Sequence, residues 1–109
     1  MIQGSAPKRV LIRASGPALG QAPFDIPGAL QDPVLSLYSG QTLIDSNSGW
    51  NPQLATDFAN VGAFAWQPNS RDSALLETLD PGAYTAQVSG ASGDTGIALI
   101  EIFDEDGSL

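Results

Sequence analysis

The chain has 109 residues but no histidine and no cysteine, and Lys8 is its only lysine. Without histidine the usual base that activates a serine nucleophile is missing, and without cysteine there is no thiolate and no disulfide framework. Lys8 lies beside Arg9 near the end of an expected strand, where water solvates it. The acidic residues fall mainly in turns and are expected to be solvated there rather than paired for catalysis. We therefore expect no catalytic residue and no enzyme activity.

Basic residues are scarce as well, because 4 of them stand against 12 acidic residues and give a net charge of -8. Such a chain repels the phosphates of nucleic acids and anionic membrane surfaces. Its apolar runs are also far shorter than the ~20 residues of a membrane helix. We expect neither nucleic-acid binding nor membrane insertion.

The remaining composition is that of one folded domain. Hydrophobic residues make up 42% and charged residues 15%, which is too apolar for a disordered chain. A chain of this length builds a single core. We predict one domain over residues 1–109, with residues 1–7 and 104–109 as extended terminal segments.

Alternating apolar residues predict about six short strands. Gly40-Gln41 and Asp80-Pro81-Gly82 are interpreted as the turns of two hairpins. The final strand is apolar on both faces, which favours a place at the centre of a sheet or under cover on both sides. The predicted strands span residues 8–14, 34–39, 42–46, 73–79, 83–89 and 96–104.

A single short helix interrupts this β pattern. Asn51 is a suitable N-cap, Pro52 fits the first helical position, and Leu54, Phe58 and Val61 follow at helical spacing. We expect the helix to plug one end of the core. The predicted fold is therefore all-β, an immunoglobulin-like or jelly-roll-like antiparallel sandwich with one short helix.

Two sets of residues invite a binding role. Asp45 and Asn47 lie in an oxygen-rich stretch that suits calcium, although the same residue types serve turns; no other cofactor is expected. Trp50 and Trp66 are either an aromatic lid over the sandwich or a platform on which sugars stack. Arg71-Asp72 is interpreted as a local ion pair or a turn contact.

Four stretches carry a family resemblance: PKRVLIRASGPAL, LQDPVLSLYSG, DSALLETLDPGAYTAQVSG and TGIALIEIFD. Together they resemble a β-sandwich module that recurs in large secreted and cell-surface proteins of environmental bacteria, and they are loosely similar to pre-peptidase C-terminal sandwiches. The resemblance implies a non-catalytic appendage outside the cell. It also implies a further strand before Gly4-Ser5, so that an edge of the first sheet is left uncovered here.

The leading hypothesis is an extracellular structural module that associates with copies of itself, head to tail, into a fibre or surface array by strand complementation. Its basic start would meet the acidic end of a neighbour. The alternative is an accessory module that binds polysaccharide through Trp50 and Trp66. The residues expected at the self-association interface are Met1, Ile2, Gln3, Lys8, Arg9, Arg13, Glu101, Asp104 and Asp106.

Overall fold

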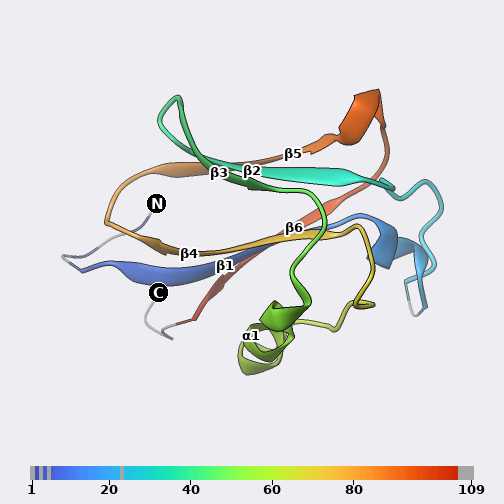
Figure 1. Cartoon of the computed structure of the whole chain (residues 1–109), viewed down its shortest axis with the longest axis horizontal. Helices are drawn as coiled ribbons and strands as arrows, with labels where there is room; N and C mark the ends of the chain where they lie inside the picture. The colour runs from blue at the N-terminus through green and yellow to red at the C-terminus, as the bar shows by residue number, and fades with distance from the viewer. Residues whose placement is uncertain (1, 3, 5, 23, 106–109) are drawn as a thin grey trace.

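The computed structural model describes residues 2, 4, 6–22 and 24–105, which form two three-stranded antiparallel sheets packed face to face (Figure 1). One sheet has the strand order β4-β1-β6 and the other the order β3-β2-β5. The predicted all-β antiparallel sandwich with one short helix is confirmed. The strands are β1 (Lys8–Ser15), β2 (Pro33–Ser39), β3 (Thr42–Asn47), β4 (Ser73–Leu79), β5 (Tyr84–Gly90) and β6 (Leu99–Asp104).

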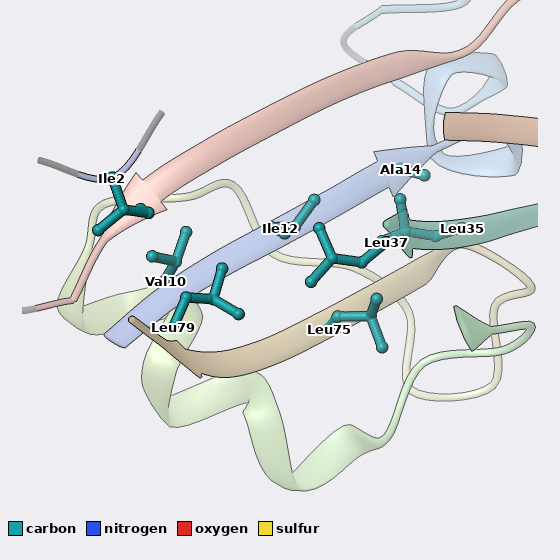
Figure 2. Packing of buried hydrophobic residues seen from close by; sticks show 8 residues of the cluster. All are labelled: Ile2, Val10, Ile12, Ala14, Leu35, Leu37, Leu75 and Leu79. Carbon is teal, nitrogen blue, oxygen red and sulfur yellow. The ribbon is translucent and has the colours of Figure 1, made fainter. Parts of the chain in front are cut away.

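The core between the sheets follows from the alternation of side chains along the strands. Val10, Ile12 and Ala14 of β1 point inward, and Leu35 and Leu37 of β2 meet them from the other sheet. Figure 2 shows these side chains together with Leu75 and Leu79 of β4. β1 lies at the centre of its sheet and is buried on both faces from Val10 onward.

The helical segment covers the outer face of the β4-β1-β6 sheet (Figure 1). Leu11 of β1 is fully buried there against Trp50, Phe58 and Trp66. The expected plug at one end of the core is therefore wrong, because the second apolar face of β1 needs a cover of its own. None of the described helices is long and apolar enough to cross a membrane. The described helices are the 3-10 helices η1 (Pro17–Gly20), η2 (Pro52–Leu54) and η3 (Ala91–Gly93) and the α-helix α1 (Ala55–Asn60).

One predicted hairpin is confirmed and the other is wrong. β2 and β3 pair across Gly40-Gln41, as expected. By contrast, β4 pairs with β1 and β5 pairs with β2, so Asp80-Pro81-Gly82 carries the chain from one sheet to the other. A turn sequence specifies that the chain reverses its direction, and it leaves open whether the next strand joins the same sheet.

The position of β6 also differs from the prediction. It pairs with β1, from Val10 opposite Asp104 to Ser15 opposite Leu99, and lies at the end of its sheet. Ile100 and Ile102 of β6 are exposed despite being apolar. The pattern predicts a strand at the centre of a sheet or under cover on both sides, whereas in the described structure β6 is an edge strand with exposed apolar side chains.

The packing predicts a contrast between two leucines of the same sheet. Leu35→Ala removes a fully buried side chain of β2 and is expected to lower the free energy of unfolding by about 3 kcal/mol, because it leaves a cavity. The matched change Leu43→Ala on β3, where the side chain is 52% exposed, should alter it by less than about 0.5 kcal/mol. Urea unfolding followed by circular dichroism measures both values. Equal losses would contradict the described core.

Candidate functional site

One side of the sandwich is open between the edge strands β5 and β6, and we call it the open side. Tyr84, Ala86 and Val88 of β5 point toward the core and are only partly buried. Ile100 and Ile102 of β6 point toward the same gap, where they are 41% and 60% exposed. Within the described residues, β5 and β6 each pair with one neighbour, so their outer edges present backbone groups for further pairing.

Two hollows mark this open side. The first, of about 110 Å³, lies toward the β4–β5 connection and reaches the interior of the sandwich. The second is shallower and lies toward η3, between Val88 of β5 and Ile100 of β6. The first hollow is lined by Ile2, Val10, Ile12, Leu37, Leu79, Tyr84, Ala86 and Ile102.

Ile2 lies at the first hollow and pairs with the backbone of Gly82 as a strand residue does. Its N–H donates to the Gly82 carbonyl at 2.7 Å, and its carbonyl accepts from the Gly82 N–H at 2.8 Å. Its side chain is buried beside Val10 and Leu79 (Figure 2). Ile2, expected at an interface between copies, thus lies in the core of its own chain, and the predicted interface residues Met1 and Gln3 lie outside the described residues.

The charged groups expected to join neighbouring copies lie side by side in one chain. Since β1 and β6 are antiparallel neighbours, the basic start of β1 runs beside the acidic end of β6. Arg13 Nε lies 3.7 Å from Glu101 Oε1, and Arg9 Nη2 lies 3.5 Å from Asp57 Oδ1. Asp104 is paired in register with Val10, next to Arg9. Lys8 begins β1, and Asp106 lies outside the described residues.

Arg13 is predicted to lie at an interface, which requires a surface residue. The structure buries it completely. Its guanidinium carbon lies 4.5, 4.4 and 4.1 Å from the ring centres of Phe58, Phe64 and Trp66. Burial lowers the pKa of Arg13, and the charge of Glu101 acts in the opposite direction. Within the described part of the chain, its nitrogens have no hydrogen-bond partner. The rings and nearby carboxylates stabilise the charge instead.

Asp72 holds the loop that follows β1. Its Oδ1 accepts hydrogen bonds from the backbone N–H groups of Gly16 at 2.7 Å and Ala18 at 3.1 Å, and its Oδ2 accepts from the Ser70 hydroxyl at 2.5 Å. Arg71 instead lies 4.0 Å from Asp32. Of the two alternatives for Arg71-Asp72, the ion pair is wrong, whereas Asp72 does make a local turn contact with Ser70 and also caps the distant turn after β1.

Trp50 and Trp66 belong to the aromatic layer over the outer face of the sheet. Each is only 6% exposed. Trp50 stacks on Phe58 at 4.8 Å and meets Trp66 edge to face at 5.5 Å, while its Nε1 donates to the Gln67 carbonyl at 3.2 Å. Neither ring presents an open face to a sugar, so their placement fits a cover over the sheet.

The side chains predicted to bind calcium are engaged with the protein. Asn47 Oδ1 accepts from the Ala74 N–H at 3.0 Å, and its Nδ2 donates to the Gly49 carbonyl at 3.1 Å. Asp45 Oδ1 accepts from the Ser46 N–H at 2.8 Å. Among the residues that the structure describes, no group of three acidic, histidine or cysteine side chains is placed to hold a metal.

Comparison with known proteins adds no family to this description. No family model, no curated protein and no solved structure matches the chain. The resemblance to a bacterial surface module therefore stays a prediction, and the site is interpreted from its own geometry.

Glu77 of β4 is expected to make the stability of the fold depend on pH. Burial, a hydrogen bond with Asp45 and the charge of Asp45 raise the pKa of Glu77 to about 7 from an ordinary 4.5. The protonated form is thus favoured by folding, so the free energy of unfolding should fall as the pH rises from 4.5 through about 7. Because Glu77 lies on an edge strand, we expect a loss of only about 1 kcal/mol.

Glu77→Gln removes the titrating group and should abolish most of this slope, leaving the variant more stable than the native chain at pH 8. Urea unfolding from pH 4 to pH 8 measures the slope. Asp80→Asn, at an exposed turn position, serves as the control for loss of one negative charge. An unchanged slope in Glu77→Gln would contradict the assignment.

Proposed function

We propose that this chain is a non-catalytic structural module of an extracellular or cell-surface protein, and that it associates with copies of itself by β-strand pairing. The observation that carries the proposal is the open side, where two strand edges and two exposed isoleucines adjoin the apolar interior. A composition with a single lysine and 12 glycines supports an exported protein. The lack of histidine and cysteine supports a role without catalysis.

Strand pairing fits the chemistry of this edge better than contact between side chains alone. The outer edges of β5 and β6 offer backbone donors and acceptors in a row, and such a row is a template for a strand from another molecule. An added strand would also cover Ile100 and Ile102, which face the interior yet remain exposed. Backbone hydrogen bonds would then supply affinity, and alternate side chains would set the register.

Magnitudes indicate a weak to moderate association. Covering a half-exposed isoleucine contributes roughly 1 kcal/mol, so two such residues from each of two copies contribute about 4 kcal/mol. Loss of translational and rotational freedom opposes this by about 4 to 15 kcal/mol. Backbone hydrogen bonds, at about 1 kcal/mol each, are therefore needed to hold the copies together. A dissociation constant of 1 µM requires about 8 kcal/mol of net binding free energy, which exceeds this sum, so we expect dissociation constants weaker than about 1 µM.

Ile102→Lys should weaken self-association by about 30-fold, because each pair of copies loses two isoleucines and gains charge on a strand edge. Sedimentation velocity over a range of concentration measures the change. Leu43→Lys on β3 is the matched control, since it replaces a similarly exposed side chain, 52% against 60%, with the same charge.

The native chain should associate more strongly as salt is added, because each copy carries a net charge of -8 and salt screens their repulsion. A contact driven by opposite charges would respond in the other direction. Equal weakening by Ile102→Lys and Leu43→Lys, or a native chain that stays monomeric at every concentration, would overturn the proposal.

A further inference from the structure

The side opposite the open side differs from it, because its edge strands β3 and β4 carry polar side chains on their inward faces. Asp45 of β3 lies in register with the buried Leu37, and Glu77 of β4 lies in register with the buried Val10, so both carboxylates are on the inward faces of their strands. Asn47 binds the backbone of Ala74. This contact fastens the edges of the two sheets to each other along the β3–β4 side.

Inward-pointing charged groups on edge strands protect a sandwich from the addition of another strand. An apolar strand laid along β3 or β4 would have to cover Asp45 and Glu77, which face the interior. A head-to-tail fibre needs two different surfaces that accept each other, whereas a two-fold pair uses one surface twice. The polar β3–β4 side is a poor second surface for an apolar strand, which favours contact between the open sides of two copies.

We infer that two copies pair through their β6 strands, antiparallel about a two-fold axis, and form a closed dimer. The sheets of the two copies then join in the order β4-β1-β6-β6-β1-β4. This inference rests on the proposed function, which is strand pairing at the open side, and it specifies that the added strand is β6 of a second copy.

The side chains of β6 select the register of this pair. Directly opposite residues of antiparallel strands lie on the same face of the sheet. With Glu101 of each copy at the axis, Ile100 of one copy lies opposite Ile102 of the other, and both pairs of isoleucines cover the open interior. A slip of two residues in one direction places Ile100 opposite Asp104, and a slip in the other places Ile102 opposite Ala98.

The two Glu101 carboxylates meet at the axis in this register, and Arg13 of each copy offsets their repulsion. The outer face of the joined sheets carries Arg13 and Glu101 of one copy followed by Glu101 and Arg13 of the other, since Arg13 and Glu101 are paired across β1 and β6. Arg13 Nε lies 3.7 Å from Glu101 Oε1, and the guanidinium is fully buried. Each carboxylate thus brings its own positive charge, and the row across the axis carries no net charge.

Cysteine cross-linking tests the register directly, because the chain has no cysteine of its own. Ile100→Cys and Ile102→Cys chains are oxidised separately and as a mixture, and peptide mass spectrometry identifies the joined positions. Directly opposite residues have Cα atoms about 4.5 to 5.5 Å apart, within disulfide range. Residues of the same number are diagonal neighbours, about 7 to 8 Å apart, and are poorly placed for a disulfide. Leu43→Cys on β3 is the control.

We expect cross-links between Ile100→Cys and Ile102→Cys chains to exceed those of either variant alone by about tenfold, with Leu43→Cys staying monomeric. No enrichment in the mixture, or equal cross-linking of Leu43→Cys, would overturn the inference. The native chain gives a second readout by sedimentation, where a mass that stops at two copies supports the closed dimer. If the native chain forms filaments that Ile102→Lys abolishes, strand pairing at the open side is supported and the closed dimer is contradicted. If the native chain is a monomer at every concentration, strand pairing and the closed dimer are both contradicted.

Discussion

The burial of Arg13 is the constraint on which much of this structure depends. A guanidinium enclosed within a protein needs nearby negative charge and a polarisable surround, because an isolated buried charge is strongly unfavourable. Here Phe58, Phe64 and Trp66 surround it, and Glu101 of the neighbouring strand lies within 4 Å. One side chain of the central strand thereby brings the helical segment and β6 together on one face of the sheet.

In this arrangement one face of β6 is packed against the rest of the chain and the other face is exposed. Its outer face is anchored, since Glu101 pairs with Arg13 and Phe103 packs against the aromatic layer. Its inner face carries Ile100 and Ile102 over an open part of the core. The strand is thus held firmly in place while its apolar side and its outer backbone edge stay available. A firmly held edge can accept a second strand with little loss of its own conformational freedom, which favours association.

Local patterns predicted the elements well, and their partners much less well. The alternation in β1 and β5 and the turn at Gly40-Gln41 are encoded in short stretches, so six strands and one helix could be expected. Strand pairing depends on residues far apart in sequence. Short stretches therefore predict a hairpin at Asp80-Pro81-Gly82 and a central or doubly covered position for β6, and the described pairing differs from both. Apolar alternation likewise indicates that Ile100 and Ile102 avoid water. It carries no information on which other strand covers them, and in the described fold none does.

Hydrogen–deuterium exchange at low and high protein concentration is the most direct test of strand pairing at the open side, because it reports which backbone N–H groups become bonded on association. We expect that every second amide of β6, where the N–H points away from β1, gains protection as concentration rises, while the amides of β3 exchange at an unchanged rate. Protection that rises in β3 and not in β6, or association without added protection in any strand, would contradict pairing at the open side.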